Sequence, residues 1–373
     1  MRVAVWTIGL PAFLVACGEG AGGAGGVGAG GGDAAFGGAA GGPSAGGGSA
    51  NGGGRAGGAG GAAGAGGECD PGGAPQIPTT PPAKLSETGL YADIASETLA
   101  SGVEPFAPKY VLWSDGGDKQ RFVSLPPCSE IDTSDMDHWS LPVGTRLWKT
   151  FVVGGVRVET RLIARYGPAP GEFWFAAYQW NDDQTDADHA PLGVEDAKGT
   201  EHDIPATSSC KLCHEYLEER ALGFGAIQLS HGGPGVTIAS LSAAGRLSVP
   251  APSGFDVPGD PVEAAALGYL HANCGNCHND TGVEFNDPFA LRVLVGDATV
   301  EATGAFGTAV GVPVEKFVQA GVTHRIAPGQ PGASCVWYRM GVRGTIQQMP
   351  PLATELVDDS GLAIVEAWIQ SLP

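Results

Sequence analysis

Residues 84–200 contain short apolar runs typical of β-strands, and the run at 156–162 alternates apolar and polar side chains with a period of two. The clearest case is a pair of strands over residues 151–162, which flank the turn Gly154-Gly155. Two glycines between alternating runs are typical of a β-hairpin. Further strands are expected at residues 110–113, 120–123 and 172–180. The spacing of the turn residues predicts a β-rich, sandwich-like domain without a helix of useful length.

Beyond residue 201 the pattern changes to helix and loop. The best-marked helix begins after Asp260, with Pro261 in its first turn and Glu263 three residues after the cap. A second helix begins at Asp358 and Asp359 and carries one apolar stripe, formed by Leu362, Val365, Trp368, Ile369 and Leu372. The predicted fold class is therefore α+β, with a β-rich domain at 84–200 followed by a mainly helical region at 201–373.

The N-terminal part of the chain cannot form a core. Residues 1–16 carry Arg2 and an apolar run too short to span a bilayer, which predicts a signal peptide. The run ends in Leu14-Val15-Ala16-Cys17, which resembles a bacterial lipobox and implies a lipid on the Cys17 thiol. Residues 17–83 are rich in Gly and Ala and then in Pro, which predicts a disordered linker. An uncleaved anchor or a buried N-terminal strand is the alternative for residues 1–16.

These features predict an exported bacterial lipoprotein that faces the periplasm or the cell surface, with the outer membrane favoured over the inner one. The net charge of −20 makes nucleic acid a poor partner and favours redox partner proteins with basic patches. The acidic loop at residues 181–188 has the hard oxygen ligands that calcium prefers, but it lacks the glycine and glutamate of the helix-loop-helix calcium motif. A solvated acidic turn is the favoured interpretation.

Two pentads, at residues 210–214 and 274–278, have the sequence Cys-x-x-Cys-His. Covalent haem attachment requires this arrangement, because each thiol adds to one vinyl group and the adjacent imidazole binds iron. Two copies among only eight Cys and eight His form a specific signal for two haems c. The residues expected to hold the cofactors are Cys210, Cys213, His214, Cys274, Cys277 and His278. Zinc bound by the four cysteines and redox-active dithiols are the alternatives.

The sixth iron ligand differs between the two motifs. Met349 lies in Gln347-Gln348-Met349-Pro350-Pro351, shortly before the last helix, and a thioether ligand there would raise the reduction potential. Met340 is the alternative, and packing in a core is the usual role of a lone methionine. No methionine lies between the two motifs, so the candidates for the first haem are His202, His231, His271 and Met340. An open position there would allow the haem to bind peroxide or another small ligand.

Three cysteines remain, namely Cys69, Cys128 and Cys335. Outside the cytoplasm two of them are expected to form a disulfide, for example Cys128 with Cys335, and one thiol is left over.

The chain from about Leu85 to Leu372 resembles a family of bacterial di-haem c-type cytochromes often found beside a parallel β-helix protein. The resemblance rests on Leu112-Trp113-Ser114-Asp115-Gly116, Glu159-Thr160-Arg161-Leu162 and the second haem motif, together with residues 85–90, 141–145, 149–151, 178–182, 222–224, 228–229 and 349–352. It implies haem binding and electron transfer, and names no substrate. The strings at 113–118 and 159–161 fit either tight turns with a structural ion pair or the edge of a haem or substrate site.

The sequence therefore predicts a membrane-anchored electron-transfer lipoprotein with two covalent haems, and residues 260–373 as a complete small cytochrome c domain. Two alternatives stay open. One is a di-haem peroxidase or oxidase with an open first haem. The other is a β-domain that binds a glycan or a partner protein, with an accessory redox role for the haems.

Overall fold

The computed structural model describes residues 77–215, 217, 220–280 and 288–373. The predicted signal peptide, Cys17, most of the predicted linker and Cys69 lie outside the described residues. Fold class α+β is confirmed, since the described residues contain eight strands and six α-helices.

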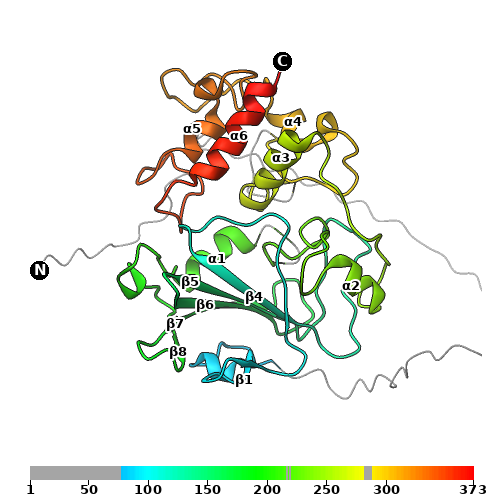
Figure 1. Cartoon of the computed structure of the whole chain (residues 1–373), viewed down its shortest axis with the longest axis vertical. Coiled ribbons are helices and arrows are strands. Elements are labelled where there is room, and N and C mark those ends of the chain that lie inside the picture. Colours follow the sequence, from blue (N-terminus) through cyan, green and yellow to red (C-terminus); the bar gives the residue numbers. More distant parts are fainter. Residues whose placement is uncertain (1–76, 216, 218–219, 281–287) are drawn as a thin grey trace, which may run out of the picture. The chain divides into compact units, whose positions relative to one another are not determined.

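Six strands form one antiparallel sheet in which each strand pairs with the next along the chain (Figure 1). In order they are β3 (Glu104–Pro105), β4 (Asp118–Ser124), β5 (Arg146–Val153), β6 (Val156–Arg165), β7 (Phe173–Trp180) and β8 (Ala187–His189). The predicted hairpin is the β5–β6 pair, whose turn glycines Gly154 and Gly155 have φ of 57° and 82°. Both values lie in the left-handed region that glycine adopts without a steric penalty.

The strands predicted at 120–123 and 172–180 are confirmed as β4 and β7, whereas the strand predicted at 110–113 is wrong. There the backbone bonds to other segments instead of a neighbouring strand. The amide of Tyr110 donates to Oε1 of Gln228 at 2.9 Å, and the amide of Trp113 donates to Oδ1 of Asn273 at 2.7 Å. An apolar run of four residues therefore became an irregular segment because of its tertiary contacts.

The expected sandwich is replaced by one large sheet with a small cover on one face. The cover consists of the 3-10 helix η1 (Leu85–Glu87) and the two-stranded sheet of β1 (Tyr91–Asp93) and β2 (Thr98–Leu99). Leu85 and Tyr91 of this cover share an apolar cluster with Trp148 and Leu162 of the large sheet. The apolar side chains on this face of the large sheet are therefore buried by the small cover, without a second large sheet.

The chain after the sheet consists of short helices and loops. The helices of its first part are η2 (Ala197–Gly199), α1 (Thr207–His214) and α2 (Ile238–Ala243). Phe106 and Ile131, which precede position 200, form one apolar cluster with Phe224 and Leu247, which follow it. All described residues belong to one compact unit.

Helices α3 (Pro261–Asn273) and α6 (Asp359–Ser371) pack side by side (Figure 1). The predicted cap of α3 is confirmed, because Asp260 accepts from the amides of Val262 and Glu263 while the Glu263 carboxylate accepts from the Asp260 amide. Gly361 permits the close packing, since a Cβ there would overlap the ring of Tyr269. The other helices of this region are η3 (Val300–Ala302), α4 (Gly304–Ala309), η4 (Pro331–Ala333) and α5 (Cys335–Met340).

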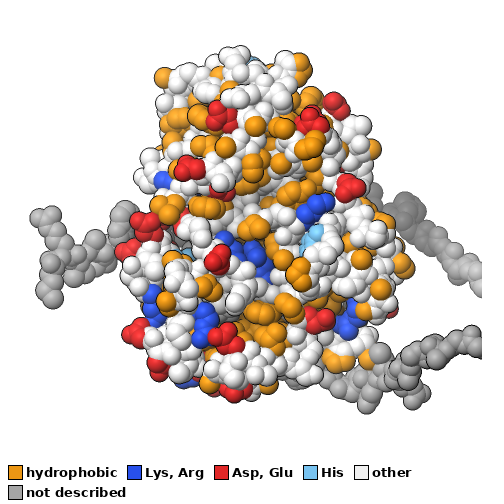
Figure 2. All heavy atoms as spheres, viewed as in Figure 1, with side chains coloured by type: hydrophobic (Ala, Val, Ile, Leu, Met, Phe, Trp, Pro, Cys, Tyr) orange, Lys and Arg blue, Asp and Glu red, His pale blue; other side chains and the backbone are white. Residues whose placement is uncertain are grey.

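The predicted apolar stripe of α6 is also confirmed, since Val365, Trp368 and Ile369 are fully buried. Among the described residues, no helix has both the length and the apolar character needed to cross a bilayer. Acidic side chains are spread over the face visible in Figure 2, and a group of Lys and Arg side chains lies near its middle. Cys128 and Cys335 are each disulfide-bonded, and their pairing with one another stays a prediction.

Candidate functional site

Both Cys-x-x-Cys-His motifs line the same cavity. Its empty volume is about 1750 Å³, including the part that opens to solvent. All four cysteines and both histidines of the two motifs lie in its wall, namely Cys210, Cys213, His214, Cys274, Cys277 and His278. Most of the remaining wall is apolar and includes Leu112, Leu212, Leu222, Phe289, Leu291, Val336 and Leu352.

The first motif is placed by the short helix α1, which has no fully buried residue. The imidazole of His214 packs α1 against the sheet, because the centroid of its ring lies 5.3 Å from that of the Phe175 ring in β7. Nδ1 of His214 lies 2.5 Å from the carbonyl oxygen of Arg220. Because a carbonyl oxygen only accepts, Nδ1 carries the hydrogen and Nε2 keeps its lone pair for a metal. Burial lowers the pKa of His214 to about 4, which keeps the imidazole neutral at pH 7.

The second motif continues directly from α3. The amide of Cys274 donates to the carbonyl of Leu270 at 2.9 Å, and the amide of His278 donates to that of Cys274, also at 2.9 Å. Gly275 is required by the packing, since a Cβ there would lie 2.7 Å from the carbonyl oxygen of His271. The helix and this tight turn hold both thiols in the cavity wall.

The imidazole of His278 is 8% exposed, and its ring centroid lies 4.7 Å from that of Phe289. Burial, followed by the charges of Arg339 and Arg325, lowers the pKa of His278 to about 4. Both motif histidines therefore have the neutral form that metal binding requires.

The second cysteines of the two motifs meet. Sγ of Cys277 lies 3.8 Å from the carbonyl oxygen of Leu212, the residue before Cys213. The interaction between the two thiols lowers the pKa of Cys213 to about 7 and raises the pKa of Cys277. Burial raises the pKa of Cys274 to about 12. Two segments far apart in the sequence thus present their attachment thiols side by side.

Met349 and Met340 both line the cavity. Met349 is partly buried, and its amide donates to the carbonyl of Arg339 at 2.9 Å, which ties the loop before α6 to the end of α5. Met340 is 6% exposed and packs in the apolar cluster around α3 and α6. The structure thus brings both thioether candidates to the motifs, and the loop residue is the less buried of the two.

The three histidine candidates for the first motif do not line this cavity. His202 is 4% exposed, and its Nε2 lies 2.8 Å from the Glu159 carboxylate. His231 has Nε2 2.6 Å from the carbonyl oxygen of Ala107, while its Nδ1 accepts from the amide of Gly233. Their ring nitrogens therefore already have partners.

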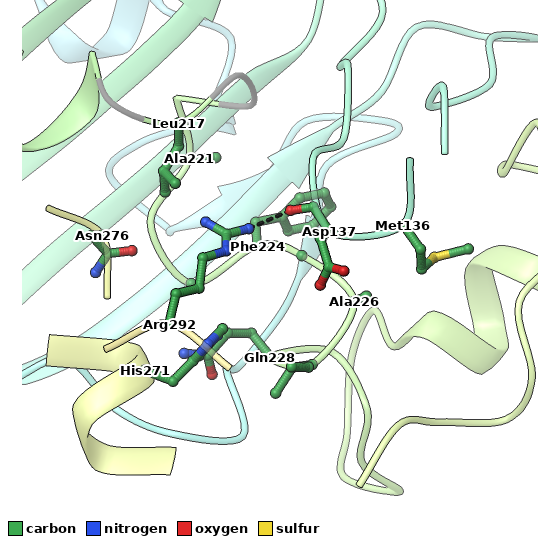
Figure 3. A pocket seen from close by; sticks show the side chains of 13 residues that line it. Met136, Asp137, Leu217, Ala221, Phe224, Ala226, Gln228, His271, Asn276 and Arg292 are labelled. Carbon is green, nitrogen blue, oxygen red and sulfur yellow. Dashed lines mark hydrogen bonds between the residues drawn. The ribbon is translucent and has the colours of Figure 1, made fainter. Parts of the chain in front are cut away.

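His271 lies in a separate, smaller cavity with an empty volume of about 370 Å³. Figure 3 shows it beside Arg292 and Gln228, and a guanidinium nitrogen of Arg292 donates to the carbonyl oxygen of Asp137. Nδ1 of His271 accepts from the amide of Val293 at 3.2 Å. Of the four candidates for the first haem, only Met340 reaches the shared cavity.

Within the described ranges, no group of three or more His, Cys, Asp or Glu side chains is close enough to hold a metal ion between them. The acidic loop forms separate contacts: Asp188 pairs with Lys84 at 2.7 Å, Asp182 pairs with Lys198, and Asp183 accepts from the hydroxyl of Thr185 at 2.7 Å. These contacts agree with the favoured interpretation of a surface turn.

The two polar strings both reach the cavity region. Asp115 accepts from the amides of Glu355 and Leu356, both at 2.8 Å, and so fastens the segment that follows Met349. Arg161 forms a two-point ion pair with Glu159 and also lines the shared cavity. The string at 159–161 is therefore both a structural ion pair and part of the cavity wall.

Lys149 also lines this cavity. It was not among the site residues expected from the sequence, although residues 149–151 contribute to the family resemblance. Because successive side chains of a strand point to opposite faces, Lys149 lies on the same face of the sheet as Leu147 and Phe151 of β5. Burial, followed by the charges of Arg161, Arg121 and Lys119, lowers the pKa of Lys149 well below its ordinary value. The period of two does not say whether that face meets solvent or a cavity.

The residues present fit haem c. Thiols, neutral imidazoles and thioethers converge on one largely apolar cavity, and Nδ1 of His214 already has the carbonyl partner typical of a ligating imidazole. Comparison of the chain with protein-family models, with curated proteins and with solved structures gave no match.

Proposed function

We propose that this protein is a di-haem c-type cytochrome that transfers single electrons. The observation that carries the proposal is that both Cys-x-x-Cys-His motifs and two methionines line one largely apolar cavity. Two copies of the motif could lie on unrelated surfaces of a protein that binds no haem. Their convergence on a shared space is what a pair of cofactors needs.

In this proposal each motif attaches one haem through its two thiols and offers its histidine to the iron. Haem bound in this way supplies a one-electron Fe(III)/Fe(II) couple. Met349 is the proposed sixth ligand at the second motif, and residues 260–373, with α3 before the motif and α6 after the methionine, form the proposed cytochrome c-like domain. The apolar wall excludes water and, with a thioether ligand, favours the reduced form.

The contact between Cys213 and Cys277 supports electron exchange within the protein. Each thiol is the proposed attachment point of a different haem. Because the two points are adjacent, the attached edges of the cofactors would be adjacent as well. Electrons entering at one motif would then reach the other without a further carrier.

We further propose that the protein belongs to the bacterial di-haem cytochrome family that it resembles, and that a lipid on Cys17 anchors it to the bacterial outer membrane on an extended linker. Its redox partners would carry basic patches that match the net charge of −20. The attraction would weaken with increasing salt, because exposed charges are screened beyond about 10 Å at 0.1 M ionic strength.

The proposal is tested on the full chain matured in a host that attaches c-type haem. A pyridine haemochrome assay should give two haems per chain, and a redox titration should give two reversible one-electron steps. Protein without haem that binds zinc instead would refute the proposal.

A second function, reduction of a small ligand such as peroxide at the first haem, has one observation in its favour. The three histidine candidates for a sixth ligand at that motif lie outside the shared cavity. The spin state of the ferric protein separates the two functions. A high-spin signal from one haem that changes on addition of peroxide would favour the enzyme, and two low-spin signals without a reaction would favour the electron carrier.

A further inference from the structure

Three basic side chains stand opposite one another across the centre of the large sheet. Arg121 in β4 pairs in register with Lys149 in β5, which pairs with Arg161 in β6. Directly opposed residues project from the same face, and neighbouring strands lie about 4.8 Å apart. The three residues, here called the cation row, therefore span roughly 10 Å on one face of the sheet.

The cation row has too little negative charge around it. Among the described residues, Glu159 is the one carboxylate that bonds to it, and both of its oxygens accept from Arg161, one of them also lying beside His202. Within the part of the chain that the structure describes, neither Arg121 nor Lys149 has an ion-pair partner. Arg121 is only 7% exposed, and its Nη2 has no hydrogen-bond partner among the described residues.

The ring of Phe151 offsets part of this charge, since its centroid lies 5.1 Å from Nζ of Lys149 and 4.5 Å from the guanidinium carbon of Arg161. Cations opposite one another on a sheet repel, and a buried charge without a partner costs several kcal/mol. The row occupies the central strands of the sheet, where hydrophobic side chains would be the stable choice. A bound group with negative charge would offset both the repulsion and the desolvation.

The space in front of the row identifies that group. Arg121, Lys149 and Arg161 line a cavity of about 580 Å³ whose wall also contains Cys210 and His214 of the first motif. Lys149, Arg161, Cys210 and His214 line the larger shared cavity as well, so the two spaces adjoin. A haem attached at Cys210 would carry two carboxylates, its propionates, and would lie in the cavity that these basic side chains line.

We propose that the cation row of Arg121, Lys149 and Arg161 binds the propionate carboxylates of the first haem. The inference rests on the proposed function and adds the residues that hold the far side of one cofactor. Arg161 offers the nitrogen that its pair with Glu159 leaves unused, and Lys149 and Arg121 offer donors that have no acceptor among the described residues. The basic side chains near the second motif, Arg339 and Arg325, lie outside the sheet, so the two haems would have different residues around their carboxylates.

The test is a redox titration of the matured full chain with the variant Lys149→Met, which removes one positive charge and keeps an unbranched side chain. Positive charge near a haem favours the added electron, so its loss should lower one reduction potential. The expected change is about tenfold in the reduction equilibrium of one haem, or about 59 mV for one electron. Lys149→Arg should restore the wild-type value, because it keeps the charge.

Lys119→Met is the matched control, since Lys119 lies on the same face two register positions away, opposite Phe151, and does not line either cavity. An equal shift in both variants would overturn the proposal, because it would reflect the general charge of the sheet. Unchanged potentials in Lys149→Met would also overturn the proposal. So would a shift in the second haem, which is identified as the one whose potential changes in the ligand variant Met349→His.

Two further results separate the possible explanations. A free carboxylate such as succinate should leave both potentials of the wild-type protein unchanged, because the propionates already occupy the row. A succinate-dependent shift would show that the row serves a free ligand and would overturn the assignment. Failure of the proposed function would be recognised differently, as loss of haem from the wild-type chain in the pyridine haemochrome assay.

Discussion

The two Cys-x-x-Cys-His motifs share one cavity, but the chain supports them in different ways. The second motif follows a capped helix of thirteen residues that packs against α6, and α3 contributes Leu267 and Leu270 to the core at zero exposure. The first motif lies on an eight-residue helix without a buried residue, and it depends on the sheet through Phe175 and on the carbonyl of Arg220. The same five-residue motif thus lies once within a helical core and once against one face of the large sheet.

The side chains around the two motifs differ as well. The first motif faces Lys149 and Arg161 from the sheet, whereas the second has Arg339 and the thioethers of Met340 and Met349 nearby. A local motif fixes the attachment chemistry, but its neighbours set the ligands and the electrostatic field. We therefore expect the two haems to have different reduction potentials.

The largest expected effect comes from removing each pair of thiols. Cys210→Ala/Cys213→Ala and Cys274→Ala/Cys277→Ala should each lower the haem content from two to one per chain, because each pair is the proposed attachment point of one cofactor. The second double variant should also lose more stability, since its motif is part of the core around α3. Haem is measured by the pyridine haemochrome assay and stability by urea unfolding. Loss of both haems in either variant would contradict independent attachment.

Met349→Ala and Met340→Ala sharpen the comparison of the two thioethers. Loss of a ligand thioether should lower the potential of one haem, because methionine ligation raises it. We expect this result for Met349→Ala. Met340→Ala should instead lower the free energy of unfolding by about 2–5 kcal/mol, the usual cost of truncating a buried Met. The two variants are compared by redox titration and urea unfolding, and an exchange of their effects would assign the ligand to Met340.

Glu159→Gln tests the sheet side of the cavity. Burial alone would raise the pKa of Glu159, but the charge of Arg161 and the hydrogen bonds from His202 and Arg161 outweigh it and hold the pKa below the ordinary value of 4.5. The ionised carboxylate therefore stabilises the fold above pH 4.5, and this contribution is lost as the pH falls through the lowered pKa. At pH 7 the variant should be less stable by about 3–5 kcal/mol, because Arg161 loses its buried partner.

The measurement is urea unfolding of both proteins at several pH values. The difference between wild type and Glu159→Gln should shrink in acid. A difference that stays constant down to pH 3 would show that the carboxylate charge does not stabilise the sheet.

The smallest effect is expected at Asp115, which is distant in the sequence and bonds to the segment that follows Met349. Asp115→Ala removes the acceptor for the amides of Glu355 and Leu356 and should cost about 1–3 kcal/mol. Asp115→Asn is the matched control, because an amide oxygen still accepts and asparagine tolerates the φ of 47° at this position. Only the alanine variant should make the Met349 haem more accessible to an added ligand such as imidazole, measured by its absorption spectrum.

Much of the local structure followed from the sequence. The cap at Asp260, the glycine turn at 154–155 and the apolar stripe of α6 depend on residues within a few positions of one another, and each is found as predicted. Local signals failed where distant partners decided the backbone. The apolar run at 110–113 is irregular because Gln228 and Asn273 take its amides.

The candidate site shows the same division. By itself, the sequence determined which residues are proposed to attach haem, since the motif is contiguous and its chemistry needs only that order of side chains. Only the tertiary structure decided that Cys213 meets Cys277, that three histidine candidates lie elsewhere, and that Arg121, Lys149 and Arg161 face the first motif. The physical reason is that a strand period gives two faces without saying what covers each face. That choice is made by packing between segments far apart in the chain.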